Sequence, residues 1–402
     1  MRPTLLLLLI LCLSPLAHAG VVDAPASQLE VSLMTYGPGD IYWERFGHDA
    51  IEVRDTVSGE SIAFNYGVFD FDQANFILNF ARGIMAYRMD AEPTASDVAF
   101  YASEGRYVQR QRLALDDAQK DRLRRFLLWN VQPANAGYRY DYYVDNCTTR
   151  VRDALDDALD GALSRQLRAR PGGMTYREQT ARLMSNQPWL MLGMDLGLGP
   201  FADQPMNAWK EAFLPMVLEN EIRQVRIGAP GSERALVADD TSVVPARLVP
   251  PPATPPELRW ILLGVGVLWA TPMALPAVTR RRGARTLAAI VSTVFLLFAG
   301  LAGIVMLGLW TLTLHRSAWG NFNLLAYQPL ALLLVPAVWR LRHAGRPMGR
   351  FAPRVAVVSA VACGVALALH LWPDFPQRNV PWLLLALPCW MALLACFGRR
   401  HD

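Results

Sequence analysis

The C-terminal third of the chain limits the possible folds most strongly, because it consists of long apolar stretches. Five of them are long enough to cross about 30 Å of hydrocarbon as helices. They run from 259 to 278, 287 to 311, 322 to 339, 355 to 372 and 382 to 397. The sequence therefore predicts an all-α five-helix transmembrane bundle over residues 258–402.

Arginine placement predicts how this bundle lies in the membrane. Eleven arginines follow the first, third and fifth spans, and only Arg259, Arg316 and Arg378 lie on the opposite side. By the positive-inside rule, the C-terminus is in the cytoplasm and residues 20–257 are outside it.

The N-terminus carries a second targeting signal. Arg2 precedes the run LLLLLILCL, and Ala17-His18-Ala19 has the small-x-small form of a signal-peptidase site. We interpret residues 1–19 as a cleaved signal peptide. The alternative, an uncleaved anchor helix, would leave the next domain on the same side of the membrane.

The two halves of the chain differ in charge as well. Residues 258–402 hold 14 basic and 2 acidic residues, whereas residues 20–257 hold 24 and 33. An acidic exported part argues against nucleic acid as a partner, because phosphate neutralisation needs a basic face. The proline-rich segment LVPPPATPPE, residues 248–257, is interpreted as a semi-rigid linker after an exported domain over residues 20–247.

Cysteine and histidine usage points to a chemistry. Cys147 is the only cysteine and His48 the only histidine between residues 20 and 257. A lone thiol in an oxidising compartment has no internal disulfide partner, so it is either buried or used. One thiol and one imidazole are what a Cys-His nucleophilic site requires.

The sequence around Cys147 favours a reactive thiol. Residues 138–147, YRYDYYVDNC, are typical of a strand or an extended aromatic segment, and an amphipathic helix follows with Asp145 or Asn146 as its N-cap. In the first helical turn, free N–H groups and the helix dipole stabilise a thiolate, and Arg150 adds positive charge. The alternative is a small cysteine packed under the helix.

His48 lies at the start of a predicted hairpin. The alternation in AIEV predicts a half-buried strand, TVSGE a turn, and SIAFNYG the returning strand. Asn65 is the first choice for a group that holds the imidazole tautomer, Tyr66 the second, and Glu44 a further possibility. Any of them can instead be structural.

The rest of the exported part is mixed α and β. Helices are expected over 71–83, 116–131, 175–199 and 206–222, a strand over 106–115, and a short hairpin or extended strand over 238–250. No nucleotide-binding fingerprint or metal-ligand spacing is visible, so we expect no cofactor and no metal.

The loop after the second span carries polar residues on the outer face. His315, Arg316, Asn321 and Asn323 are expected there, where such residues bind lipid head groups or dock a soluble part. The alternative is an ordinary interfacial loop anchored by Trp319.

Several runs together resemble a known family. FGHDAIEV, FNYGVFDF and YDYYVDNCTTRVRDAL, followed by the predicted spans, look like the Lnb-type lipoprotein N-acyltransferase family, and GMDLGLGPFADQP and FLPMVLE are similar too. The resemblance implies an α+β permuted papain-like (NlpC/P60-like) extracytoplasmic domain, in which histidine precedes cysteine. It also implies that Cys147 is the nucleophile and His48 the general base and acid.

The resemblance further implies a membrane-bound enzyme of the bacterial inner membrane. Its acyl donor would be a phospholipid of the bilayer, and its acceptor the N-terminal amine of a lipoprotein, with a thioester on Cys147 between them. Backbone N–H groups of the cysteine helix, with Asn146, Thr148 and Arg150, would bind the oxyanion or substrate. The alternatives are a cell-wall amidase or peptidase with the same Cys-His dyad, and a non-catalytic envelope docking protein.

Overall fold

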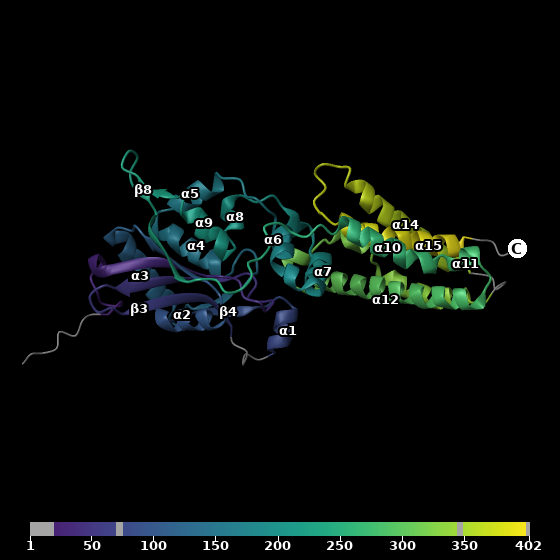
Figure 1. The fold of residues 1–402 in the computed structure, drawn as a ribbon, viewed down its shortest axis with the longest axis horizontal. Coiled ribbons are helices and arrows are strands. Elements are labelled where there is room, and N and C mark those ends of the chain that lie inside the picture. Colours follow the sequence, from purple (N-terminus) through teal and green to yellow (C-terminus); the bar gives the residue numbers. More distant parts are fainter. Residues whose placement is uncertain (1–19, 70–74, 344–348, 399–402) are drawn as a thin grey trace, which may run out of the picture.

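The structure is a computed structural model, in which residues 20–69, 75–343 and 349–398 are described. They form two parts that follow one another along the long axis of the molecule (Figure 1). A mixed α and β part comes first, and a helical part follows. The predicted signal peptide, residues 1–19, and Arg399 and Arg400, which are expected in the cytoplasm, lie outside the described residues.

An antiparallel sheet forms the centre of the first part. Among the described residues it has seven strands in the order β6-β4-β3-β2-β1-β5-β9, and β7 and β8 pair separately. The strands are β1 (Leu29–Tyr36), β2 (His48–Asp55), β3 (Ser61–Phe69), β4 (Ala86–Pro93), β5 (Val108–Leu113), β6 (Gly137–Arg139), β7 (Arg226–Ile227), β8 (Arg234–Ala235) and β9 (Val237–Val244). The hairpin predicted to begin at His48 is confirmed as β2 and β3.

Helices pack on both faces of this sheet. They are α1 (Phe76–Ala81), α2 (Thr94–Ser103), α3 (Asp117–Asn130), α4 (Cys147–Ala158), α5 (Ala162–Arg168), α6 (Tyr176–Leu183), α7 (Pro188–Gly197), α8 (Ala208–Glu211) and α9 (Pro215–Ile222). Because strand side chains alternate, Leu33 and Ile51 are buried on the face covered by α3 and α4. Tyr36 and Ala50 are buried on the opposite face, which is covered by α2.

The segment before Cys147 differs from the prediction. Only Gly137–Arg139 is strand, and the chain then turns, with Asp141 and Asp145 bonded to each other through their backbones. The Asp141 carboxylate accepts a hydrogen bond from the backbone N–H of Tyr143 at 3.0 Å. Such a local side-chain bond offers the backbone an alternative to a strand ladder, which explains the early end of the strand.

The helical part contains four stretches that are long and apolar enough to cross a membrane, among the described residues, rather than the five predicted. They are Arg282–Leu312 (α12), Arg316–Arg340, Phe351–Leu369 (α14) and Val380–Phe397 (α15). The first predicted span is a shorter apolar helix, α10 (Arg259–Met273), followed by α11 (Leu275–Val278). Pro276 has no N–H to continue the α10 hydrogen-bond ladder, so the helix ends early.

The third predicted span, residues 322–339, is not one continuous α-helix. It consists of the 3₁₀ segments Phe322–Leu325 and Pro329–Leu334 and the helix α13 (Val335–Arg340). Pro329 opens the second segment, and a proline cannot donate the backbone bond that would join it to the preceding turn. Short 3₁₀ pieces are the usual result where such bonds are missing.

Candidate active site

Helix α4 begins at Cys147 because Asn146 caps it. The side-chain oxygen of Asn146 accepts from the N–H of Thr149 at 2.8 Å, and the Thr149 hydroxyl accepts from the N–H of Asn146 at 2.7 Å. Of the two predicted caps, Asn146 rather than Asp145 is used. The N–H groups of Cys147 and Thr148 therefore have no acceptor within the helix and lie at the positive end of its dipole.

The thiol of Cys147 and the imidazole of His48 are brought together from different elements. They form a side-chain hydrogen bond, and Cys147 is only 8% exposed. Burial raises the pKa of the Cys147 thiol, but the charge of His48 and this hydrogen bond outweigh it and hold the pKa below its ordinary value. The thiolate of Cys147 is therefore easier to form than that of an isolated cysteine.

The pKa of His48 is shifted in the opposite direction. Burial lowers the pKa of His48, but the charge of Cys147 and hydrogen bonds with Cys147 and Asn65 raise it above its ordinary value. A lowered thiol pKa and a raised imidazole pKa together favour a thiolate–imidazolium ion pair. This is the activated form that nucleophilic Cys-His sites use.

Asn65 fixes the orientation of the imidazole. Its Oδ1 lies 2.9 Å from Nε2 of His48, and its Nδ2 donates to Oδ2 of Asp97 at 2.8 Å. Because Asp97 requires the amide donor, Oδ1 faces the ring and Nε2 carries a proton. Nδ1 is then the ring nitrogen left to interact with the thiol.

Asp97 extends the series of hydrogen bonds that starts at His48 and Asn65, and the sequence did not reveal it. It lies in the first turn of α2, is 5% exposed, and also accepts from the hydroxyl of Tyr36 at 3.1 Å. An aspartate in a first helical turn is ordinary, so nothing in the local sequence marks it. Only the packing of α2 on the sheet brings it to Asn65.

Tyr66, the second choice for the orienting group, does not contact His48. Adjacent strand residues point to opposite faces, so Tyr66 points away from Asn65. Its hydroxyl donates to Oδ1 of Asn130, at the end of α3, at 2.8 Å. The interpretation of Tyr66 as the group that holds the imidazole is therefore wrong.

The residues predicted to bind the oxyanion lie close to Cys147 in the chain. They differ in whether their side-chain donors are already engaged. Asn146 donates through Nδ2 to the carbonyls of Tyr142 at 3.0 Å and Phe213 at 2.9 Å. Both amide hydrogens are thus engaged, and the side chain has no donor left for an oxyanion. This corrects the expectation for Asn146.

Thr148 and Arg150 are likewise held by neighbours. The Thr148 hydroxyl lies 3.9 Å from the Cys147 sulfur and interacts with the carboxylate of the buried Asp49. Burial raises the pKa of Asp49 to about 7. Arg150 pairs with Asp145 at 2.8 Å, so its charge is partly neutralised.

A buried tyrosine hydroxyl near the thiol was missed by the sequence analysis. Within the described part of the chain, the hydroxyl of Tyr138 is buried without a hydrogen-bond partner. Burial, and next the charge of Cys147, raise its pKa above the ordinary value, so the hydroxyl keeps its proton. An unsatisfied buried donor is costly, which marks Tyr138 as a candidate functional group.

Gly67 keeps the space between these groups open. It lies in a β-bulge with a φ of +93°, and a Cβ placed there would be 3.4 Å from Cβ of Cys147 and 3.9 Å from the hydroxyl of Tyr138. The positive φ favours glycine, whereas the distances are those of ordinary van der Waals contacts. A side chain at Gly67 would therefore fill the space between the thiol and the phenol.

The four polar residues predicted on the outer face all contact the first part of the chain. Of the two roles considered for them, docking of the exported part is the one that these contacts support. The contacts are His315 Nε2 to Phe80 O at 3.1 Å, Arg316 Nη2 to Asp141 Oδ2 at 3.7 Å, and the amide nitrogens of Asn321 and Asn323 to Leu196 O at 2.8 and 2.9 Å.

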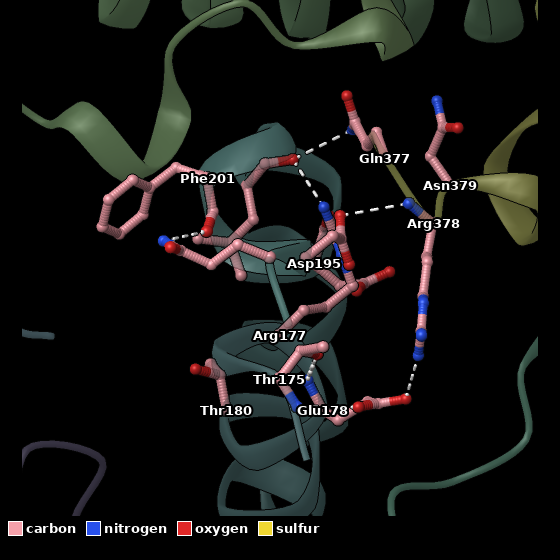
Figure 2. A network of polar contacts seen from close by, with 12 residues as sticks. Thr175, Arg177, Glu178, Thr180, Asp195, Phe201, Gln377, Arg378 and Asn379 are labelled. Carbon is pink, nitrogen blue, oxygen red and sulfur yellow. Dashed lines mark hydrogen bonds and ion pairs between the residues drawn. The ribbon is translucent and has the colours of Figure 1, made fainter. Parts of the chain in front are cut away.

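A buried ion-pair network joins the two parts next to these contacts (Figure 2). Arg177 of α6 pairs with Asp195 at 3.0 Å and with Asp203 at 2.8 Å, and all three are less than 10% exposed. The network continues into the helical part, where Trp382 donates to Asp195 at 2.7 Å and the backbone N–H of Arg378 to Asp203 at 3.1 Å. The exported part is thus fixed to the membrane part by buried polar contacts.

Within residues 20–69, 75–343 and 349–398, no group of three or more His, Cys, Asp or Glu side chains is placed to hold a metal ion. These residues define a class: a membrane protein whose α+β domain holds a cysteine–histidine pair, with the histidine bonded to an asparagine.

Comparison with known families identifies the protein more closely. Residues 21–183 match the Lnb N-terminal periplasmic domain, and residues 253–397 match the Lnb transmembrane domain. The chain therefore belongs to the Lnb family, and its first part is periplasmic and its second part transmembrane. Membership suggests an enzyme. No curated protein and no solved structure matches the chain.

Proposed function

We propose that this protein is a thiol-dependent acyltransferase, which moves an acyl chain from a membrane phospholipid through a Cys147 thioester to the N-terminal amine of a lipoprotein. The observation that carries the proposal is the Cys147–His48 pair, with its lowered thiol pKa, in a domain docked on a transmembrane part. A permuted papain-like fold, with the histidine strand before the cysteine helix, belongs to the same proposal.

The first half-reaction forms the thioester. The Cys147 thiolate attacks the carbonyl carbon of a phospholipid ester, a C–S bond forms, and the C–O bond to the glycerol breaks. The His48 imidazolium donates its Nδ1 proton to the departing oxygen, which leaves as the hydroxyl of a lysophospholipid. Asn65 holds the ring in position for this transfer.

The second half-reaction returns the site to its starting state. The α-amine of the lipoprotein attacks the thioester carbonyl, an amide bond forms, and the C–S bond breaks. Neutral His48 accepts a proton from the amine, so the thiolate–imidazolium pair is restored. The low exposure of Cys147 limits access of water, which would otherwise hydrolyse the thioester.

In both steps the backbone N–H groups of Cys147 and Thr148 and the hydroxyl of Tyr138 would stabilise the oxyanion. We expect Tyr138→Phe to slow acylation by about 10- to 100-fold, below or near the 10²–10³ that a lost oxyanion donor costs, because the N–H groups remain. Thermal stability should not fall, since the hydroxyl has no hydrogen-bond partner among the described residues. Equal acylation rates in the variant and the wild type would show that Tyr138 has no such role.

The direct test uses the purified full chain and a phospholipid with a labelled acyl chain. We expect a labelled protein adduct that hydroxylamine removes, because hydroxylamine cleaves thioesters, and no such adduct in Cys147→Ser. Transfer of the label to a diacylated lipopeptide would complete the reaction. Release of peptides from murein without any adduct would instead favour the amidase, and neither reaction would leave a docking protein.

A further inference from the structure

One stretch of aromatic rings leads from the catalytic thiol to the membrane part. Tyr140 lies beside Cys147: a Cβ at Gly67 would be 3.6 Å from its ring and 3.4 Å from Cβ of Cys147. Tyr140 stacks on Tyr87, with ring centroids 4.4 Å apart, and Tyr87 contacts Phe69 at 5.3 Å. The rings thus continue away from the thiol along the ends of β3 and β4.

The rings continue into helix α1. Phe69 stacks on Phe76 at 6.3 Å, and Phe76 contacts Phe80 at 6.1 Å. We call this series, Tyr140, Tyr87, Phe69, Phe76 and Phe80, the aromatic track. Its members are partly exposed, Phe69 by 36% and Phe80 by 41%, so the track lies at the surface.

Helix α1 is bonded to the end of a transmembrane helix. The backbone N–H of Leu314, just after α12, donates to the carbonyl of Arg82 at 2.8 Å, and His315 contacts the carbonyl of Phe80 at 3.1 Å. Figure 1 shows α1 on the side of the periplasmic domain that faces α12. The far end of the track therefore adjoins the membrane part.

The exposed face of α1 is unsuited to water. The helix FILNFA has no charged residue, and Ile77 is 81% and Leu78 56% exposed. Large apolar side chains of this exposure, next to the end of a spanning helix, are typical of a surface that enters the lipid.

We propose that α1 dips into the outer leaflet and that the aromatic track binds the acyl chain of a phospholipid, guiding it from the bilayer to Cys147. This inference rests on the proposed acyltransferase function for its second half. The ligand class is a hydrocarbon chain, because the track offers ring faces along its length and no charged side chain.

The lipid contact is tested without activity. A photo-crosslinking residue, p-benzoylphenylalanine, replaces Ile77 in the full-length Cys147→Ala chain, in vesicles of phosphatidylethanolamine and phosphatidylglycerol with labelled acyl chains. The control places it at Val57, which is 53% exposed in the turn between β2 and β3, away from the membrane part. Crosslinking to lipid at 77 and not at 57 is expected; lipid crosslinking no stronger at 77 than at 57 overturns the proposal.

The acyl route is tested by comparing two donors. Ile77→Asp should lower the ratio of acylation from these vesicles to acylation from the water-soluble ester p-nitrophenyl butyrate by about tenfold or more, since lipid burial of one isoleucine side chain favours binding by that factor. Val57→Asp should keep the wild-type ratio. A wild-type ratio in Ile77→Asp overturns the route and leaves the proposed function intact. No acylation of the wild type by either donor refutes the proposed function and with it the acyl route, while the crosslinking still decides the lipid contact.

Discussion

Replacing His48 with alanine is expected to slow acylation of Cys147 by about 10²–10⁴-fold, the range that a general acid–base residue contributes. The imidazolium is the group that protonates the departing lysophospholipid oxygen in the proposed mechanism. It is also the source of the charge and the hydrogen bond that lower the pKa of the thiol. The variant therefore loses both the proton donor and the activation of the nucleophile.

The two losses can be measured separately. Without His48, burial is the largest remaining influence on the Cys147 thiol, so its pKa should rise above the ordinary value instead of lying below it. At pH 7 the rate of alkylation by iodoacetamide should then fall by about tenfold for each unit of that rise. The control is His370→Ala, a histidine at the end of α14 that contacts Phe375. An unchanged alkylation profile in His48→Ala would contradict the ion pair.

Replacing Arg177 with methionine is expected to cost about 3–5 kcal/mol of stability, because it leaves the buried carboxylates of Asp195 and Asp203 without their cation. Methionine fills a similar length of side chain, so the loss is electrostatic more than steric. Thermal unfolding of the detergent-solubilised protein, followed by tryptophan fluorescence, measures it.

An exposed ion pair supplies the matched control. Arg122 pairs with Asp160 on the surface, where the two side chains are 43% and 71% exposed. Arg122→Met should change stability by no more than about 1 kcal/mol, since surface pairs contribute little. If the two variants unfold at the same temperature, the Arg177 network does not hold the domains as described.

The sequence was most informative where a local signal exists. The helix that begins at Cys147, the strand that begins at His48 and the choice of Asn65 follow from capping residues, alternation and rarity of residue type. Each depends on a few consecutive residues, so no tertiary contact was needed to predict it. The family resemblance was confirmed on both parts of the chain.

The site residues that the sequence missed or misassigned depend on contacts between distant segments. Asp97 contacts Asn65 only because α2 packs on the sheet, and Tyr138 is recognised only because its hydroxyl has no partner within the described ranges. The capping bonds of Asn146 use its oxygen, but the two carbonyls that occupy its nitrogen come from the fold. The broken third span shows the converse case, in which prolines divide a stretch whose mean composition is that of a continuous helix.

The buried polar junction between the two parts has a mechanical consequence. A thiol on a freely moving domain could approach the lipids directly, but the buried polar contacts hold this domain in a fixed position relative to the transmembrane helices. In the proposed mechanism, the phospholipid ester would therefore have to move to the sulfur, with part of its acyl chain leaving the leaflet. Contacts between the acyl chain and the protein surface would then have to offset the free energy of removing that chain from the leaflet.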